Sequence, residues 1–212
     1  MRLRKVKNAL ERIKENPKCI VDPKSLKGKW KDLFKNDNPI YLEVGMGKGS
    51  FLIEHAKRNP NINYIGMEKF DSVLVRACEK KEFNELENIY FILGDANDLL
   101  EMFEENELDK IYLNFSDPWP KARHEKRRLT SHVFLSKYQV ILKDDHTLEF
   151  KTDNRVFFEY SVKSFNEYKV LFVDLRLDLH KDEDVIDNVQ TEYEEKFSKL
   201  GPIYKIEIKF YN

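Results

Sequence analysis

The sequence predicts a single α/β domain built on a mostly parallel seven-stranded sheet, with helices on both faces and one antiparallel edge strand. Short apolar segments recur along the chain and alternate with helical segments, which is typical of a parallel sheet covered on both sides. One of these apolar segments runs directly into a glycine-rich turn. The 212 residues are 41% hydrophobic, so one domain of this length can bury a sizeable core.

The expected strands are seven apolar runs, at residues 40–44, 63–68, 89–93, 110–115, 147–151, 169–173 and 203–208. Helices are expected from about Ser50 to Arg58 and from about Ser72 to Phe83, the first being ended by Pro60. The last two strands have no helical crossover of the earlier kind between them, which predicts the antiparallel edge strand. Ligands of such sheets bind beyond the carboxyl ends of the strands.

The first 35 residues are expected to form a basic N-terminal arm, followed by one domain over residues 36–212. The arm carries 12 Lys and Arg against 4 Asp and Glu, and residues 121–128 carry 5 against 1. Helical spacing is shared by four apolar residues of the arm, Leu3, Val6, Leu10 and Ile13. The net charge is only −1, so acidic residues elsewhere balance these clustered cations and the charge is unevenly distributed. A surface polarised in this way can hold a polyanion on one face. Ordinary solvated charge is the alternative for the arm.

No apolar run approaches the roughly 20 residues that a membrane span needs, and the basic N-terminus lacks the apolar stretch of a secretory signal. The two cysteines, Cys19 and Cys78, lie far apart and without metal-ligand spacing. We therefore expect them to be small apolar packing residues, with no disulfide and no metal site. This pattern is typical of a protein of the reducing cytoplasm.

The segment from Glu43 to Gly49 reads Glu-Val-Gly-Met-Gly-Lys-Gly between a strand and a helix. Glycines allow a tight turn and a close approach of a ligand, and the N–H groups that open the helix face that ligand. The spacing is GxGxG rather than the GxGxxG of dinucleotide-binding proteins. Taken alone, the motif also fits a structural turn or another nucleotide fold.

Two acids at the ends of the following strands favour a bound nucleoside. Glu68 ends the second strand, where a carboxylate can accept both hydroxyls of an adenosine ribose. Asp95 ends the third strand, just before Ala96, where a side chain can bond the adenine edge. A single acid in such a place is usually a helix cap, but acids in register on successive strands are better explained by a ligand.

At the tip of the fourth strand, Asp117 is followed by Pro118, Trp119 and Pro120. The two prolines restrict the backbone. A rigid loop of this kind is suited to holding a substrate base near the bound nucleoside. Trp119 is either a stacking face or a core side chain. The basic run of residues 121–128 follows directly, and cations beside such a loop suit phosphate contacts. Its histidine is interpreted as an RNA or packing contact, since no partner nucleophile or metal-ligand set accompanies it.

The sequence resembles the bacterial tRNA (guanine-N7-)-methyltransferase family over essentially the whole chain. The matching motifs are Asp117 to Lys121, Arg123 to Leu129, Lys151 to Asn154 and Thr191 to Phe197. The resemblance implies a Rossmann-like class I methyltransferase fold, S-adenosylmethionine as the methyl donor with S-adenosyl-L-homocysteine as product, and tRNA as partner. The implied target is N7 of the variable-loop guanine at position 46. A monomer and a homodimer are both compatible with it.

The glycine turn and the resemblance together give the expected site residues. The cofactor-binding set is Glu43, Gly45, Gly47, Gly49, Glu68, Asp95, Ala96 and Asp117. The substrate-binding set is Lys121, Asp153, Thr191, Glu192, Tyr193 and Glu194. The RNA-interacting set is Arg123, His124, Lys126, Arg127 and Arg128. Asp117 is also the expected catalytic residue, because guanine N7 carries a free lone pair and its methylation depends on alignment and on stabilisation of the growing positive charge.

The chain departs from the family's pattern at Met46, at Lys143 to His146, where glycines are usual, and at Val156. These departures concern local loop shape. Three rival functions stay open. An adenine amino-methyltransferase uses an acidic Pro-Pro-aromatic loop that superficially resembles residues 117–120, and a non-catalytic RNA-binding module keeps the same fold. A nicotinamide-dependent oxidoreductase is disfavoured by the glycine spacing.

Overall fold

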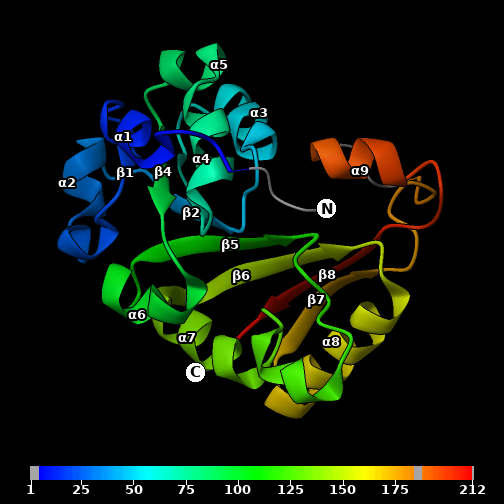
Figure 1. Ribbon diagram of the computed structural model, residues 1–212. Coiled ribbons are helices and arrows are strands. Elements are labelled where there is room, and N and C mark those ends of the chain that lie inside the picture. The colour runs from blue at the N-terminus through cyan, green and yellow to red at the C-terminus, as the bar shows by residue number, and fades with distance from the viewer. Residues whose placement is uncertain (1–4, 184–187, 212) are drawn as a thin grey trace.

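The structure is a computed structural model that describes residues 5–183 and 188–211. An eight-stranded sheet runs through the molecule in the strand order β1-β4-β3-β2-β5-β6-β8-β7. Figure 1 shows helices α1, α3, α4 and α5 on one side of this sheet and helices α6, α7 and α8 on the other. The expected α/β architecture with helices on both faces is confirmed.

The strands are β1 (Cys19–Ile20), β2 (Ile40–Val44), β3 (Asn63–Glu68), β4 (Ile89–Leu93), β5 (Leu108–Asn114), β6 (Leu142–Thr152), β7 (Leu171–Arg176) and β8 (Tyr204–Lys209). The α-helices are α1 (Ala9–Lys14), α2 (Trp30–Phe34), α3 (Ser50–Arg58), α4 (Asp71–Cys78), α5 (Lys81–Glu85), α6 (Leu99–Met102), α7 (His132–Ile141), α8 (Arg155–Tyr168) and α9 (Glu192–Phe197). Three short 3₁₀ segments are η1 (Pro23–Leu26), η2 (Ala96–Asp98) and η3 (Ala122–Arg127).

The sheet is parallel except for β8, which pairs antiparallel with both β6 and β7. The expected reversed strand near this edge is therefore confirmed, and it lies one place in from the outermost strand β7. The eighth strand is β1, a two-residue segment that pairs parallel with β4. A run of two residues is too short to show an apolar periodicity, which explains why seven strands were expected.

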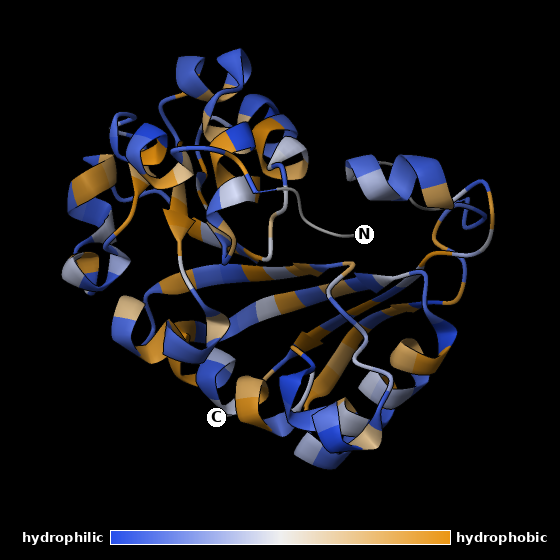
Figure 2. Cartoon of the chain, in the orientation of Figure 1, coloured by the Kyte–Doolittle hydropathy of each residue, from blue (hydrophilic) through white to orange (hydrophobic). Residues whose placement is uncertain are grey.

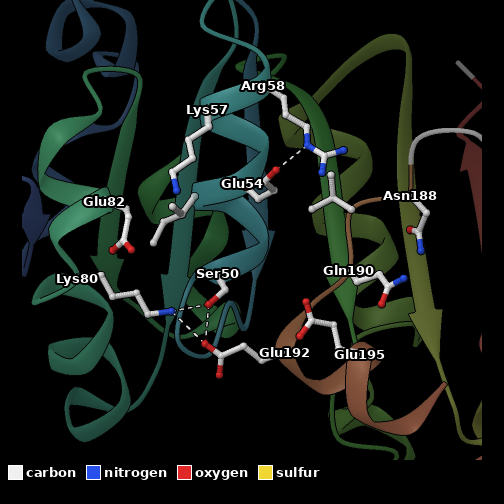
Figure 3. A pocket seen from close by; sticks show the side chains of 12 residues that line it. Ser50, Glu54, Lys57, Arg58, Lys80, Glu82, Asn188, Gln190, Glu192 and Glu195 are labelled. Carbon is white, nitrogen blue, oxygen red and sulfur yellow. Dashed lines mark hydrogen bonds and ion pairs between the residues drawn. The ribbon is translucent and has the colours of Figure 1, made fainter. Parts of the chain in front are cut away.

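The helix expected over residues 72–83 is divided into α4 and α5. Lys80 is extended, with ψ at 129°, and this interrupts the helix. The side chain of Asn84 compensates for the lost helical bonds, because its amide donates to the carbonyls of Cys78 at 3.1 Å and Lys80 at 2.9 Å. The interruption also directs the Lys80 ammonium toward α9 (Figure 3).

Two apolar layers hold the sheet between its helices. On one face Phe51 and Leu74, from α3 and α4, belong to a buried cluster, and on the other Leu135 and Phe165, from α7 and α8, belong to a second. Figure 2 shows apolar segments along the strands and hydrophilic segments on the outer helical surfaces. Each fully buried large apolar side chain stabilises the fold by roughly 1.5–3 kcal/mol. Among the described residues, no helix has the length and apolar character needed to cross a membrane.

The described part of the first 35 residues packs against the domain. Strand β1 extends the sheet beside β4, and Asn16 donates to the carbonyl of Cys78 at 3.0 Å. Trp30 is fully buried and its indole N–H donates to the carbonyl of Met102 at 3.0 Å. Leu3, the first apolar residue of the expected helical pattern, lies outside the described residues.

The expectation for the two cysteines is wrong in one respect. Cys19 and Cys78 are buried among apolar side chains as predicted, but they form a disulfide, with their Cα atoms 6.5 Å apart. Their separation of 59 residues in sequence hides the proximity, which arises because β1 pairs with β4 and so reaches the end of α4. This contact depends on the tertiary fold and has no counterpart in the spacing of the sequence.

Candidate active site

The glycine turn between β2 and α3 leaves open space for a ligand. Gly45, Gly47 and Gly49 all have positive φ, at 82°, 59° and 72°, a conformation that side chains rarely adopt. A Cβ placed on Gly45 or Gly47 would have no neighbour within 4 Å, whereas one on Gly49 would lie 2.6 Å from the ring of Phe91. The first two glycines therefore face open space, and the third also allows close packing on β4.

Glu68, at the end of β3, is bonded directly to this turn. Its Oε2 accepts the Gly47 N–H at 3.1 Å, and its Oε1 accepts the N–H groups of Lys69 at 2.9 Å and Phe70 at 3.0 Å. Burial raises the pKa of this carboxyl, and the three backbone hydrogen bonds oppose the shift. A carboxylate accepts about four hydrogen bonds, so Glu68 keeps acceptor capacity for a hydroxyl.

Glu43, in β2, carries a buried oxygen that has no partner among the described residues. Its Oε1 accepts the side-chain amide of Asn114 at 2.8 Å, but its Oε2 and the Asn114 Oδ1 are both buried and unpaired. Burial raises the pKa of Glu43 to about 7, against the opposing effects of Asn114 and the Lys151 ammonium. Buried polar atoms are rarely left unpaired, so this pair of acceptors indicates a ligand that donates hydrogen bonds.

Asp95 follows β4 and caps η2, accepting the Asn97 N–H at 2.9 Å. Its other oxygen lies 2.5 Å from the Lys69 ammonium. Burial works to raise the pKa of this carboxyl, and the bonds from Asn97 and Lys69 outweigh burial and lower it. Beside Asp95 lies a cavity of about 250 Å³ that is also lined by Gly94 and by residues 21–24. Ala96 begins η2 directly after Asp95.

Asp117, on the loop after β5, is exposed to solvent. Its carboxylate is close enough to Glu68 to raise the pKa of the Glu68 carboxyl. Phe115 and Trp119 flank Asp117 with positive φ, at 52° and 41°, which is uncommon for bulky residues and often found at functional sites. The Phe115 N–H donates to the Lys151 carbonyl at 2.9 Å. The loop thus has a strained, fixed shape.

The Trp119 ring lies outside the buried core. The Arg127 guanidinium lies 4.9 Å from its centroid, and the His124 ring meets it edge-on at 5.5 Å. Trp119 was expected to be either a stacking face or a core side chain, and its position outside the core favours the stacking face.

The structure brings the expected substrate residues Asp153 and Tyr193 together. The Tyr193 hydroxyl donates to Asp153 Oδ2 at 3.0 Å, and its ring lies 5.0 Å from that of Phe115. Burial and the Asp153 carboxylate raise the pKa of Tyr193 to about 12. The tip of β6, the start of α9 and the Asp117 loop are therefore in contact.

Glu192 faces the glycine turn and the α4–α5 junction. Its carboxylate accepts bonds from Ser50 at 2.6 Å and Lys80 at 3.0 Å (Figure 3). It also accepts a bond from Lys48 at 2.8 Å. The bonds from Lys48 and Ser50, with a smaller contribution from Lys80, lower its pKa to about 2. These contacts border a cavity of about 800 Å³ between α3 and residues 188–195. This larger cavity is separate from the one beside Asp95.

Glu194 is fully buried and is bonded within the protein. Its carboxylate accepts bonds from His180 at 3.0 Å and Asn188 at 2.7 Å, and it lies 3.4 Å from the Lys151 ammonium. Thr191 caps α9 by accepting the Glu194 N–H at 2.9 Å. Lys151, only 2% exposed, also donates to Asn188 at 2.5 Å. This Lys151 cluster fixes the start of α9 against β6.

The basic run lies along η3 directly after the Asp117 loop. Lys121, Arg123, Lys126 and Arg127 are exposed, whereas Arg128 is half-buried. Residues that carry contacts at the site and were absent from the expected set include Asn114, Lys80 and Lys151. Of these, Lys151 had a visible pattern, since it is a charged residue in an otherwise buried strand.

The glycine turn and the acids on consecutive strand tips lie together at one edge of the sheet, the edge at which folds of this kind bind their ligands. The turn has GxGxG spacing, and the tip of β5 carries an acid–proline loop. The described residues of that tip include no acid–base pair of the kind that a nicotinamide-dependent oxidoreductase needs for hydride transfer. The fold and the site together define a class I methyltransferase dependent on S-adenosylmethionine.

Comparison with known proteins identifies the family. A family model described as a putative methyltransferase matches residues 37–206. The tRNA (guanine-N(7)-)-methyltransferase of Geobacillus sp. (strain WCH70) is 51% identical over 212 residues, which cover 99% of this chain and 96% of that protein. The enzyme of the same name from Bacillus subtilis (strain 168) is 52% identical over 193 residues, covering 91% and 90%. The chain belongs to the tRNA (guanine-N(7)-)-methyltransferase family.

Solved structures show the same fold at much lower identity. An antibiotic-related methyltransferase superposes with a TM-score of 0.63 at 17% identity, covering 87% of this chain and 94% of the other. The 16S rRNA methyltransferase KamB gives a TM-score of 0.63 at 11% identity with the same coverage. These likenesses confirm the Rossmann-like methyltransferase architecture.

Proposed function

We propose that the protein transfers a methyl group from S-adenosylmethionine to N7 of a guanine in the variable loop of tRNA. The observation that supports this best is the row of strand tips at one edge of the sheet. There Glu68 binds the glycine turn, Glu43 keeps one buried oxygen unpaired, and Asp117 stands on the next loop. Relatives that are 51% and 52% identical are tRNA (guanine-N(7)-)-methyltransferases, which supports guanine in tRNA as the substrate.

The residues present fit the methyl donor. The unpaired oxygens of Glu43 and Asn114 require a hydrogen-bond donor, and the amino group of S-adenosylmethionine is one. Glu68 has acceptor capacity for the ribose hydroxyls, and Asp95 borders a cavity suited to the adenine. When bound, S-adenosylmethionine supplies a methyl group on a positively charged sulfur.

Asp117 is the proposed catalytic residue. Guanine N7 carries a lone pair and no proton, so no residue has to remove a proton before transfer. The purine becomes cationic as the new bond forms, and a carboxylate fixed beside it stabilises that charge. The strained loop around Asp117 holds the carboxylate in place, so its orientation requires little reorganisation during the reaction.

The remaining substrate residues divide into two roles. Asp153, Tyr193 and Lys121 are proposed to contact the guanine. The Asp153 carboxylate can accept hydrogen bonds from the guanine N1–H and N2 amino group. Glu192 and Glu194 are already bonded within the protein. We propose that these two carboxylates hold the start of α9 in position, with Thr191 as its cap.

The exposed cations of η3, Arg123, Lys126 and Arg127, are proposed phosphate contacts beside the catalytic loop, together with His124. The basic residues among the first 35 are a second proposed region of phosphate contact. In this proposal residues 1–35 are a basic arm, and residues 36–212 are the methyltransferase domain. Phosphate contacts of this kind weaken with salt in proportion to their number. Extruding a buried variable-loop base requires roughly a few kcal/mol, which these contacts offset.

Incubation of the protein with labelled S-adenosylmethionine and unmodified tRNA, followed by nucleoside analysis, tests the proposal. We expect 7-methylguanosine as the labelled product. Label in an adenine amino group would instead identify an adenine methyltransferase. Binding of tRNA without any labelled product would identify a non-catalytic RNA-binding module.

A further inference from the structure

Arg128 differs from the other cations of its run. By resemblance it belongs to the RNA-interacting segment, but its guanidinium points at the protein's own backbone. Its Nε donates to the carbonyls of Pro118 at 3.1 Å and Trp119 at 3.3 Å, and its Nη2 donates to the Trp119 carbonyl at 3.1 Å. The same group lies 4.1 Å from the ring centroid of Tyr160 in α8. These contacts occupy the edge of the guanidinium formed by Nε and Nη2, and one of its faces.

The other members of the run are free to face a ligand. Arg123, Lys126 and Arg127 are exposed, and within residues 5–183 and 188–211 the contact of the Arg127 guanidinium is with the Trp119 ring, at 4.9 Å. Adjacent arginines therefore have opposite surroundings, one turned outward beside the tryptophan and one turned inward beneath the loop. Sequence position alone cannot separate them, because both belong to one basic segment.

The loop above Arg128 has few internal hydrogen bonds to define its shape. Pro118 and Pro120 have no N–H to donate, and Trp119 has a φ of 41°. On the other side of Asp117, the Phe115 N–H is bonded to the Lys151 carbonyl at 2.9 Å. Arg128 supplies the matching restraint on the second side. A planar guanidinium satisfies two carbonyls at once, which a lysine ammonium does with far less directional control.

We propose that Arg128 is a positioning residue that fixes the Asp117 loop, and not a phosphate contact. The proposal rests on the proposed function, because it concerns the residue expected to align guanine N7 with the methyl group. It predicts that the shape of the guanidinium matters more than its charge. It also predicts that Tyr160, on which the guanidinium stacks, affects the same step.

The test compares Arg128→Lys, Arg128→Gln and Tyr160→Leu with Arg127→Gln as the matched variant. Lys163→Gln, on the exposed surface of α8, controls for loss of a surface charge. For each we measure kcat per S-adenosylmethionine-binding site, KM for tRNA, the salt dependence of tRNA binding, and Tm. Because the active sites are counted by S-adenosylmethionine binding, partly unfolded protein does not lower the measured kcat.

Both Arg128 variants should lose on the order of 10²-fold in kcat, the size expected from a misplacement of about 1 Å, and keep the wild-type salt slope. Tyr160→Leu should lower kcat by about tenfold in the same way. Arg127→Gln should raise KM and reduce the salt slope by roughly one contact. Lys163→Gln should resemble the wild type.

A wild-type kcat in Arg128→Lys, together with a reduced salt slope in Arg128→Gln, would overturn the proposal and make Arg128 a phosphate contact. If the Arg128 variants do not fold, Tyr160→Leu decides, and a wild-type kcat for that variant would also overturn it. A wild type that makes no 7-methylguanosine is a separate outcome, since it contradicts the proposed function before any variant is compared.

Discussion

Glu43 is the carboxylate whose charge the ligand-free protein accommodates least well. Burial raises its pKa to about 7, and one of its oxygens has no partner among the described residues. A group whose pKa is raised in the folded state stabilises the fold while it is protonated, below its unfolded pKa, and this stability is lost as the pH rises through the folded value. For Glu43 the relevant window runs from about 4.5 to about 7.

Glu43→Gln should therefore stabilise the ligand-free protein at pH 8 by on the order of 3 kcal/mol, since each unit of pKa shift corresponds to about 1.4 kcal/mol. At pH 5 this difference should shrink to about 1 kcal/mol or less, because the Glu43 carboxyl is then still mostly neutral in the folded protein. Urea unfolding at both pH values measures the difference. Asn114 can still donate to the glutamine oxygen, so the existing bond is kept.

The variant has to be compared with the wild type at each pH, because His55 also makes the free energy of unfolding depend on pH in this interval. Burial lowers the pKa of His55 to about 4, so its contribution to stability falls as the pH drops below its ordinary value of 6.5. That change has the opposite sign and is common to both proteins. A stability difference that does not grow between pH 5 and pH 8 would contradict the assignment to Glu43.

Asp117→Asn tests the catalytic role with little change in side-chain size. The amide lacks the negative charge that stabilises the cationic purine, and loss of one such electrostatic contact typically lowers kcat by about 10²- to 10³-fold. Affinity for tRNA should stay within about twofold, because binding depends mainly on phosphate contacts. Single-turnover methylation and filter binding measure the two quantities. Near-normal methylation by the variant would remove Asp117 from the mechanism.

At the scale of elements, Glu192 holds α9 beside the glycine turn and the α4–α5 junction. Lys80 connects it to the α4–α5 junction, and this junction exists because the expected single helix is broken at Lys80. Removing the Lys80 ammonium leaves Glu192 with Lys48 and Ser50. The start of α9 should then be held less firmly in the orientation that places Tyr193 beside Asp153.

Lys80→Met should accordingly raise KM for tRNA by about fivefold, as expected for the loss of a partly exposed ion pair worth about 1 kcal/mol, with little change in kcat at saturating tRNA. Lys81→Met is the matched control. Its side chain is 85% exposed and is paired with Glu85, so its steady-state constants should equal those of the wild type. Equal KM values for the two variants would show that Glu192 holds α9 without Lys80.

Lys151 connects β6 to α9 inside the protein. Its ammonium and the Glu194 carboxylate are 2% and 0% exposed, and removing one partner of a buried pair typically destabilises a protein by about 3–5 kcal/mol. Lys151→Met should show this loss in urea unfolding. Lys205→Met is the control, because Lys205 lies directly opposite Lys151 on β8 and bonds other carboxylates.

Adding Glu194→Gln to Lys151→Met should restore part of the lost stability, since no unpaired charge then remains buried. Methylation should stay impaired in this double variant, because Asn188 still lacks its donor. Recovery of both stability and methylation together would show that the Lys151 cluster has no positioning role.

The strands were the most predictable elements of the fold. Those at 40–44, 63–68 and 89–93 were expected with the bounds that the structure has, because buried parallel strands are continuous apolar runs between turn residues. The helix expected over residues 72–83 was wrong at Lys80, where the backbone is extended and the Asn84 side chain replaces helical hydrogen bonds. Strand β1 depends entirely on its pairing with β4 and has no pattern of its own.

The candidate site was predictable where it follows the sheet. Acids at strand tips are brought together by the parallel order itself, so Glu43, Glu68 and Asp95 lie at one edge as expected. The orientation of individual side chains was not predictable. Glu192, Glu194 and Arg128 belong to motifs expected to bind substrate or RNA, yet each is bonded within the protein, and such pairings depend on residues distant in sequence.

At the scale of the whole molecule, the disulfide connects the N-terminal segment to the end of α4. Cys19 and Cys78 are separated by 59 residues, and closing a loop of this length stabilises a protein by about 4 kcal/mol in the chain-entropy model. Reduction should therefore lower Tm by about 10 °C for a chain of this size. Differential scanning calorimetry with and without dithiothreitol measures the shift, after thiol titration under denaturing conditions has established the oxidised state.

The double variant Cys19→Ala, Cys78→Ala is the control, since its Tm should not respond to dithiothreitol and should lie near that of the reduced wild type. Loosening of residues 5–20 should also expose the α4 surface on which α1 packs, so that limited proteolysis cuts the reduced protein first within this segment. An oxidised protein whose Tm and cleavage pattern are unaffected by reduction would show that packing of α1 and β1 alone holds the segment in place.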